Sequence, residues 1–424
     1  MDTGKRIEIG QVRRYAWMNI VVGVLVWGVA LAGISMMMPV MYNTIAKDMN
    51  WTVAETTSFM AIKSGISALG GLFAGTLIAR YGMRRVFLPS MVTIGVSTAS
   101  LYFVSSLPLY YLLAATSGFA SILSLVAIQV TMARWYAASL GKMTGIAMLG
   151  GAAAGFVVPM ATTVGLARYG WHATAGIAGL FVLFVVTIAI SFLIHESPET
   201  YGYTATELDP PIAHGTQSGR VAVGPGPEFA EIRRSRGFWL LLVAAAMSGV
   251  ISNGINEYIP IYIERQTNLG AYLAALGFTI VIVISGVGKI LFGWLFDKFS
   301  TRGVALCWAL CGVAALLTFP LTGMITFVLF TVVRGLSHGG VVVQAPVLAR
   351  HIYGTRALPQ VISLLGAAFH LGASAGIAAI GFGVDATGGF TIPFTVVTII
   401  AFSAAAMATR FVPTYWPGHE PKAR

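Results

Sequence analysis

The chain has 424 residues, of which 57% are hydrophobic and only 10% are charged, and its formal net charge is +11. Soluble domains carry about 25% charged residues, so this composition excludes a soluble globular protein and indicates a polytopic membrane protein. The only two cysteines, Cys307 and Cys311, lie in one apolar run, which excludes a disulfide framework and gives no metal-ligand spacing.

Apolar runs long enough to cross a membrane follow one another along almost the whole chain. A span needs about 20 apolar residues, and twelve are expected, at 17–42, 54–78, 86–104, 108–131, 143–165, 172–194, 238–262, 272–296, 303–322, 324–348, 358–383 and 390–412. We predict an all-α membrane protein of twelve transmembrane helices in two pseudo-symmetric six-helix bundles. The bundles are expected at 1–194 and 237–424, and the polar segment 195–236, rich in Pro, Gly and Glu, is expected to be a cytoplasmic linker.

The Lys and Arg residues are unevenly divided between the two sides of these spans. With a cytoplasmic N-terminus, twenty of the 26 fall on the inner side, three lie within spans, and only Lys47, Arg168 and Arg265 fall on the outer side. Such a bias is the usual mark of the cytoplasmic face. We therefore expect both termini in the cytoplasm and the protein in a bacterial inner membrane. Because topology explains the basic charge, nucleic acid is excluded as a partner.

Two stretches have the same layout in the two halves of the chain. The stretch 63–85 reads KSGISALGGLFAGTLIARYGMRR, and the stretch 281–302 reads VIVISGVGKILFGWLFDKFSTR. Each places one lysine, Lys63 or Lys289, inside an apolar run that ends in a charged turn. This repeat indicates that the two halves are related.

Six ionisable residues lie inside the predicted spans and away from the span ends, and only one of them is acidic. They are Lys63, Glu257, Lys289, Arg334, His338 and His370. From the helical rise of about 1.5 Å per residue, all but Glu257 and His338 are expected near the membrane midplane. A charge at that depth is costly unless it faces a cavity, a partner or a substrate. Because three permanent cations accompany one carboxylate, we expect an electropositive cavity that favours anions.

Some of these residues also recur at helical spacing. Arg334, Ser337 and His338 share one face of the tenth span, and the seventh has the same spacing in Asn253, Asn256 and Glu257. These polar faces favour a cavity lining, although interhelical hydrogen bonds explain them equally well.

Each buried cation has a simpler explanation as well. Lys63 and Lys289 could extend their stems to a membrane interface. Arg334 could be a structural partner of Glu257 or of backbone carbonyls, and His370 could be a satisfied core histidine. Set against these alternatives, the residues expected to bind the substrate are Lys289, His370, Lys63, Arg334 and Asn256.

The two charged turns resemble the signature loops of the major facilitator superfamily. The matching residues are Gly75, Arg80, Gly82 and Arg84 in GTLIARYGMRR, and Gly293, Asp297 and Arg302 in GWLFDKFSTRG. The resemblance covers the whole chain and implies that these turns gate the cytoplasmic side. The first turn has Ala79 at the family's acidic position, so we expect the latch to depend on Asp297.

Within the superfamily, KMTGIAMLGGAAAGFVVP, LARYGWHATAGIAGL and YGTRALPQVISLLGAAFHLGASAGIAAIGFGVDATGGF resemble the monocarboxylate transporter and oxalate/formate antiporter branch. In that branch a basic residue on helix 8 binds the substrate carboxylate, and some members carry a second cation on helix 11. These positions hold Lys289 and His370. Ser285 stands where monocarboxylate–proton symporters have an aspartate, which departs from their proton-coupling arrangement.

Together these features predict a secondary active transporter of a small mono- or dicarboxylate. Coupling to protons through His370, His338 or Glu257 and exchange against a counter-anion both remain open. Proton-driven efflux of drugs or metabolites, which needs an acidic cavity, and a non-transporting sensor on the same fold are the alternatives. We find no enzyme motif, cofactor motif or metal site in the sequence, and we expect a monomer in contact with membrane lipids.

Overall fold

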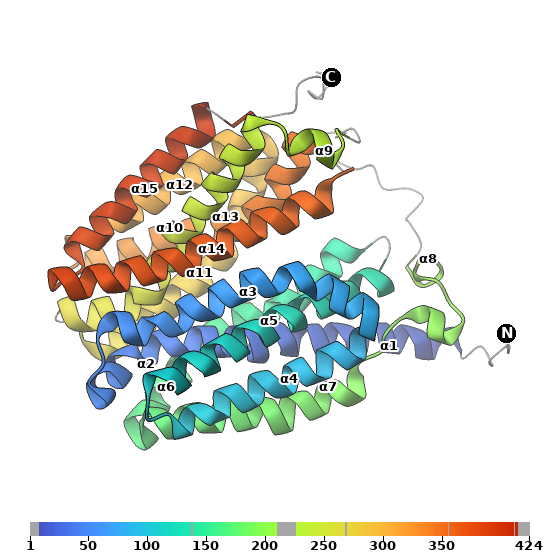
Figure 1. Cartoon of the computed structure of the whole chain (residues 1–424), viewed down its shortest axis with the longest axis horizontal. Helices are drawn as coiled ribbons and strands as arrows, with labels where there is room; N and C mark the ends of the chain where they lie inside the picture. The colour runs from blue at the N-terminus through green and yellow to red at the C-terminus, as the bar shows by residue number, and fades with distance from the viewer. Residues whose placement is uncertain are drawn as a thin grey trace. The chain divides into compact units, whose positions relative to one another are not determined.

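The computed structural model describes residues 8–136, 139–209, 226–267, 269–354, 356–410 and 412–413. Within these residues all regular secondary structure is helical, and the helices form two compact units (Figure 1). Unit 1 comprises Met1–Met38 and Leu69–Ser218, and unit 2 comprises Pro39–Ala68 and Gly219–Arg424. The predicted bundle boundaries at 194 and 237 follow the sequence repeat and stay a prediction. Residues 210–225 of the predicted linker lie outside the described residues.

Unit 1 holds most of the N-terminal helices. Its elements are α1 (Ile9–Leu25), the π-helical segment η1 (Val26–Ala32), the start of α2 (Gly33–Met49), the second part of α3 (Val53–Tyr81), α4 (Met83–Ala99), η2 (Ser100–Phe103), α5 (Leu107–Trp135), α6 (Leu140–Leu180), the π-helical segment η3 (Phe181–Val186), α7 (Thr187–Leu193), η4 (Pro198–Tyr201) and α8 (Ala205–Leu208). Helix α4 packs against α5, and α6 packs against α1 and η1. Phe87, Met91 and Trp135 are among the large buried side chains of its core.

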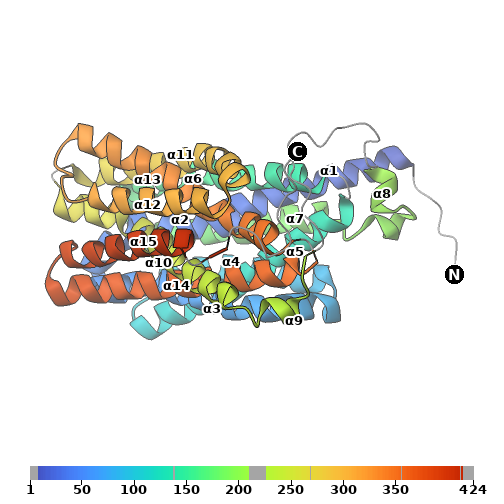
Figure 2. The ribbon, with the colours of Figure 1, turned by 90° about the horizontal axis from the view of Figure 1, so that it is seen from above.

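Unit 2 holds the C-terminal helices together with the rest of α2 and the first part of α3. Its other elements are α9 (Phe229–Ile232), α10 (Arg236–Gln266), α11 (Gly270–Phe299), α12 (Thr301–Leu316), α13 (Met324–Tyr353), α14 (Leu358–Thr387) and α15 (Thr391–Arg410). The helices pack mainly in three pairs, α11 with α13, α10 with α14 and α12 with α15 (Figures 1 and 2). Trp308 in the core donates to Gln344 at 2.7 Å, and Gln344 donates to Ser248 at 2.7 Å. This neutral network joins α12, α13 and α10.

Ten helices in the described part of the chain are long and apolar enough to cross a membrane. One of them, Met143–Leu193, contains two of the predicted spans, which follow one another with only a kink between them. The kink is at Gly170 of α6, which has a φ of 76° and a ψ of 172°. The predicted span 303–322 corresponds to a shorter apolar helix, Thr301–Leu316. The helices therefore match all twelve predicted spans, and the predicted all-α membrane fold is confirmed.

Helix pairs in both units approach so closely that only glycine fits at the contact. A Cβ atom on Gly150 of α6 would lie 2.0 Å from the carbonyl oxygen of Val24 on α1. One on Gly372 of α14 would lie 1.9 Å from the carbonyl oxygen of Ala246 on α10. In a membrane, helix association depends on such close packing, because removal from water contributes little between helices.

The segment Pro39–Ala68 belongs to unit 2 although unit 1 precedes and follows it in the chain. The N-terminus of its helix α3 contacts Asp385 of α14. The Asp385 carboxylate accepts hydrogen bonds from the backbone N–H of Val53 at 2.9 Å and of Ala54 at 2.8 Å. A carboxylate at this position satisfies amides that lack an intrahelical partner and interacts favourably with the helix dipole. Asp385 thus anchors the segment on the C-terminal helices.

Candidate functional site

The ionisable side chains predicted within the spans all belong to unit 2. They come from α3 within the segment Pro39–Ala68 and from helices α10, α11, α13 and α14. They form three groups, which are centred on Glu257, on Arg334 and on Lys289. The groups differ in how completely each charge is matched by its neighbours, and this difference determines what the site can bind.

Glu257 on α10 is buried and has partners from α2 and α3. The hydroxyl of Tyr42 donates to its Oε2 at 3.2 Å, and Lys63 and Glu257 interact electrostatically. Lys63 is 7% exposed and Glu257 is 8% exposed, so both charges are largely removed from water. An unpaired charge buried in this way would cost several kcal/mol. The carboxylate of Glu257, the one acid away from the span ends, is therefore already matched by a cation.

His370 on α14 lies beside this first group. The Oγ of Ser64 is 3.4 Å from the His370 Nδ1 and donates to the His370 carbonyl oxygen at 3.1 Å. The charge of Lys63 also acts on the His370 imidazole. Lys63, Glu257 and His370 thus form one electrostatic cluster across α3, α10 and α14, in which a proton on one group changes the charge that the others experience.

Arg334 on α13 is fully buried and binds the neighbouring helix α10. Its Nε donates to Asn256 Oδ1 at 2.9 Å, and its Nη2 donates to the carbonyl oxygens of Ile251, at 3.2 Å, and Ser252. Its Nη1 has no hydrogen-bond partner among the described residues. These contacts join the polar faces of the seventh and tenth spans by interhelical hydrogen bonds, as one of the two interpretations of the sequence expected.

His338 follows Arg334 by one turn of α13. Its Nδ1 lies 2.7 Å from the Oγ of Ser252 on α10. The charges of Arg334 and Lys289 both act on its imidazole. His338 therefore connects the Arg334 group with α11 electrostatically.

Lys289 on α11 differs from the other two cations. It is half-buried, and no hydrogen bond or ion pair links its ammonium group to another of the described side chains. Gly286 and Gly293, at i−3 and i+4, share its side of the helix, and a Cβ atom on either would meet nothing within 4 Å. Lys289 therefore extends from a strip of α11 with open space beside it.

The first predicted gating turn is held to α7 and the residues after it. The Nη2 of Arg84 donates to the carbonyl oxygen of Ser191 at 3.0 Å, and its backbone N–H donates to a Glu196 carboxylate oxygen at 3.3 Å. Gly82, between α3 and α4, has a φ of 85°, which favours glycine there. Arg80 is exposed, so it is available to solvent or lipid headgroups.

The second predicted gating turn closes α11. Arg302 is exposed, and open space surrounds Gly293 in this turn and Gly75 in the first. The side chain of Asp297 lies outside the described part of the structure. Its expected role as a latch therefore stays a prediction.

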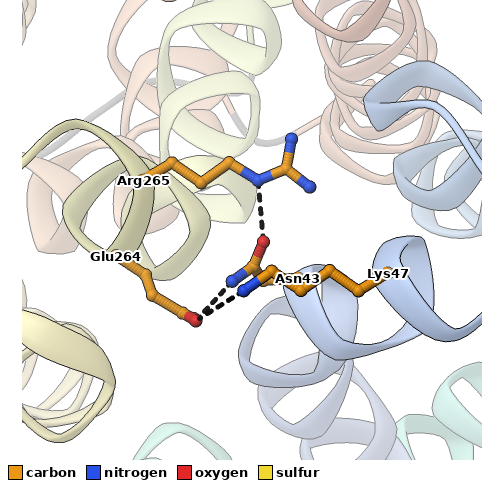
Figure 3. Close-up of polar contacts among 4 residues, drawn as sticks. All are labelled: Asn43, Lys47, Glu264 and Arg265. Carbon is orange, nitrogen blue, oxygen red and sulfur yellow. Dashed lines mark hydrogen bonds and ion pairs between the residues drawn. The ribbon is translucent and has the colours of Figure 1, made fainter.

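Sequence reasoning missed a polar cluster near the end of α10 that the predicted topology places outside. Figure 3 shows Asn43 between two charged neighbours: its Nδ2 donates to Glu264, and its Oδ1 accepts from the Nε of Arg265 at 2.7 Å. The Nζ of Lys47 lies 3.9 Å from Glu264 Oε1. The adjacent opposite charges of Glu264 and Arg265 at a span end were the available signal.

Three hydroxyl partners were also missed, those of Tyr42, Ser64 and Ser252. A single hydroxyl in an apolar run carries no signal of which residue it contacts. Their partners lie 215, 306 and 86 residues away in the chain, so only the tertiary structure reveals them.

The chain is similar to known membrane transporters in sequence and in fold. The sequence model of the family described as Major Facilitator Superfamily matches residues 23–307 and 266–424 of this chain. A bacterial homologue of the human lysosomal transporter Spinster, inward-facing and unoccupied, is 17% identical with a TM-score of 0.70, over 93% of this chain and 96% of its own. A mutant of the peptide transporter POT in complex with sulfate is 15% identical with a TM-score of 0.69, over 95% and 98%. No curated protein matches the sequence. At these identities the solved structures bear on the fold alone.

Proposed function

We propose that this chain, which belongs to the major facilitator superfamily and is therefore a transporter that works by alternating access, carries a small organic anion. The family and the fold make it a transporter and not an enzyme. The choice of an anion depends on the side chains of unit 2, and the observation that carries it is the unmatched ammonium group of Lys289.

The argument follows from how each intramembrane charge is compensated. Lys63 interacts with the carboxylate of Glu257, and Arg334 is surrounded by carbonyl and amide oxygens. Lys289 has no such neighbour among the described residues, and open space adjoins it. A carboxylate about 4 Å from this ammonium would gain about 4 kcal/mol at an effective dielectric constant of 20. That is about half of the free energy of a micromolar complex.

The other expected binding residues are proposed to support this contact. Arg334 and Asn256 are bonded to one another and hold α10 against α13, so we assign them the positioning of the site. The remaining donor of Arg334 is Nη1, and a direct contact with the substrate in another conformation would use this atom. His370 and Lys63 are the second candidates for contact, through the cluster that they form with Glu257.

That cluster also offers a mechanism for proton coupling. A proton on Glu257 would remove the negative charge that matches Lys63, and Lys63 would then attract an anion more strongly. Proton and anion binding would therefore favour one another, as linkage requires of a symporter. His370 and His338 are the other proposed proton acceptors. In an anion exchanger, Glu257 would instead stay ionised throughout the cycle.

We also retain the wider expectations as proposals. The substrate is a mono- or dicarboxylate, as in the monocarboxylate and oxalate/formate branch, and the protein works as a monomer in a bacterial inner membrane with both termini in the cytoplasm. Efflux of cationic compounds is less favoured, because its acidic cavity would have to use Glu257, which already has Lys63 and Tyr42 as partners.

The test is substrate binding by the purified transporter and by two lysine variants. Thermal unfolding in detergent is followed with mono- and dicarboxylates, amines and sugars, because a ligand that binds only the folded state stabilises it. We expect one or more carboxylates to raise the unfolding temperature, and Lys289→Ala to weaken their apparent affinity at least about 10-fold, or about 1.4 kcal/mol.

Lys298→Ala is the matched control, because Lys298 lies on the same helix but is exposed and contacts only aromatic rings in the described structure. It should respond like the wild type. Uptake of labelled carboxylate into proteoliposomes should be similar for the wild type and Lys298→Ala and lower for Lys289→Ala. Stabilisation by amines in place of carboxylates, or an unchanged affinity in Lys289→Ala, would rule out the proposed anion site.

A further inference from the structure

Unit 1 contains a cavity of about 640 Å³ that takes no part in the proposed transport site. Its walls come from α1, η1, the start of α2, α4, both parts of α6 and η3. Gly28, Ile94, Val158, Ala178 and Phe181 are representative of the lining, which is almost entirely apolar. The volume lies within the range of about 300–1,000 Å³ that is typical of ligand pockets.

The few polar side chains of this lining offer little to water. The hydroxyls of Thr98, Thr162 and Thr174 donate to the carbonyl oxygens of their own helices at 2.8, 2.7 and 2.7 Å. An apolar cavity of about 150 Å³ already stays dry and takes up an apolar molecule such as benzene. The lining of this cavity likewise offers water few hydrogen-bond partners, so water is a poor occupant.

The lining also favours an apolar occupant on energetic grounds. Contact between apolar surface and water is unfavourable, and an apolar molecule in the cavity would remove that surface from water. The cavity therefore favours an apolar occupant.

The mouth of the cavity shows where such an occupant enters. Val164 and Tyr169 in the first part of α6, and Ile177 in its second part, line the cavity and are 52%, 62% and 57% exposed. They lie on either side of the break at Gly170. The cavity thus opens between the two spans of α6, on a surface that consists of apolar membrane-spanning helices.

Both π-helical segments of the described chain border the cavity, η1 through Val29 and η3 through Val182. A π-helical turn inserts a residue into the helix and is frequently found at functional sites. Two such segments on different helices therefore point to a space that the fold maintains.

From these observations we infer that the cavity holds one acyl chain of a bilayer phospholipid. The chain would enter between the two spans of α6, where apolar side chains of membrane-spanning helices are exposed. Tyr169 lies at the mouth, and the exposed Arg168 adjoins it in the chain. A tyrosine and a cation suit the level of the lipid headgroup, and the arginine can pair with a phosphate.

The test compares the lipid response of the transporter with that of variants whose cavity is filled. Ala178→Phe places a ring in the cavity, and Ala161→Phe, at an exposed lining position, serves if the first variant does not fold. Val185→Phe adds the same ring to the exposed side of η3, which does not line the cavity, and is the control. Each protein is delipidated in detergent and titrated with phosphatidylglycerol while thermal unfolding is followed.

We expect phosphatidylglycerol to raise the unfolding temperature of the wild type and of Val185→Phe by several degrees, and to raise that of the filled variants by less than half as much. A phosphatidylglycerol with a photoreactive acyl terminus should label peptides that line the cavity in the wild type, and label them at least 5-fold less in Ala178→Phe or Ala161→Phe. Equal shifts in all four proteins would overturn the inference. Equal stabilisation by a free fatty acid with none by phosphatidylglycerol would overturn the choice of a phospholipid.

Discussion

The two units of the molecule differ in the parts that cross the membrane. In unit 1 the predicted spans contain no Asp, Glu, Lys or Arg, and they surround a large apolar cavity. In unit 2 the corresponding region holds all six ionisable groups that lie away from the span ends, including Lys63, which the segment Pro39–Ala68 contributes from the N-terminal half of the sequence. The charges have thus gathered in one compact unit, although the two halves of the sequence share a repeat.

A substitution at a tight helix contact of unit 1 should have the largest effect. Gly150→Leu places a side chain where even a Cβ atom would lie 2.0 Å from a carbonyl oxygen of α1, and we expect a loss of about 3 kcal/mol or more of unfolding free energy. Gly145→Leu on the same helix, with nothing within 4 Å, should cost less than about 1 kcal/mol. Unfolding of both variants in detergent measures this, and similar costs would show that packing does not dominate in unit 1.

Arg334 and Lys289 sharpen the comparison within unit 2. Arg334→Met removes three hydrogen bonds and leaves Asn256 and two carbonyl groups without this donor, so we expect a loss of about 2–3 kcal/mol in stability. Lys289→Met removes a cation without partners among the described residues and should leave stability unchanged or higher. Denaturant titrations of the two variants distinguish a structural cation from a ligand-binding one, and equal losses would contradict the distinction.

Glu257→Gln tests whether the charge cluster couples protons to the anion. The amide keeps an oxygen that can accept from Tyr42, but it imitates the protonated acid and leaves Lys63 without its countercharge. We expect uptake driven by a pH gradient to fall at least about 10-fold, equivalent to about 1.4 kcal/mol, while anion affinity rises and loses its pH dependence. Proteoliposome uptake with and without the gradient measures both, and a normal response to the gradient would exclude Glu257 as the coupling group.

Asp385 tests how firmly α3 is held to the C-terminal helices. Asp385→Ala removes the acceptor for two backbone amides of α3, and a lost helix cap costs about 0.5–2 kcal/mol. Asp385→Asn keeps one oxygen acceptor and should cost less. Hydrogen exchange at Val53 and Ala54 should accelerate in the same order, and unchanged exchange would mean that other contacts hold the segment.

The smallest expected effect lies in unit 1, outside the spans, at His195. Burial lowers the pKa of its imidazole from 6.5, the hydrogen bond to the Leu193 carbonyl opposes this shift, and the charge of Arg84 adds to it. Because the unfolded chain then binds the proton more readily, stability should decrease as the pH falls through about 6.5 towards the lower folded pKa. The loss should be below about 1 kcal/mol, since the ring is partly exposed. His195→Gln should abolish this pH dependence. An unchanged slope of unfolding free energy against pH would show that another group causes it.

The sequence predicted the helices because hydropathy is a local property of a run of residues. It placed all twelve spans, although it could not foresee that Gly170 leaves two of them almost continuous or that Thr301–Leu316 is short. It also identified the ionisable residues of the site, since a charge in an apolar run is visible without a structure. Family membership confirmed the broad prediction of a membrane transporter.

The partners of those residues depend on contacts between distant parts of the chain. Tyr42 and Glu257 are 215 residues apart, and Val53 and Asp385 are 332 residues apart, so no local pattern links them. Arg334 and Lys289 look alike in sequence and differ only in the oxygens that surround them. The cavity of unit 1 could not be predicted either, because it is defined by space that no side chain fills.

Two helices of this transporter run from one unit into the other. Helix α2 crosses at Pro39, and α3 crosses at Ala68, just before Gly70 and Gly71. Proline cannot donate to the carbonyl of the preceding turn, and paired glycines weaken helical rigidity. A displacement of unit 1 against unit 2 would therefore act on the chain where its helical backbone is already weakened, at Pro39 and at the paired glycines.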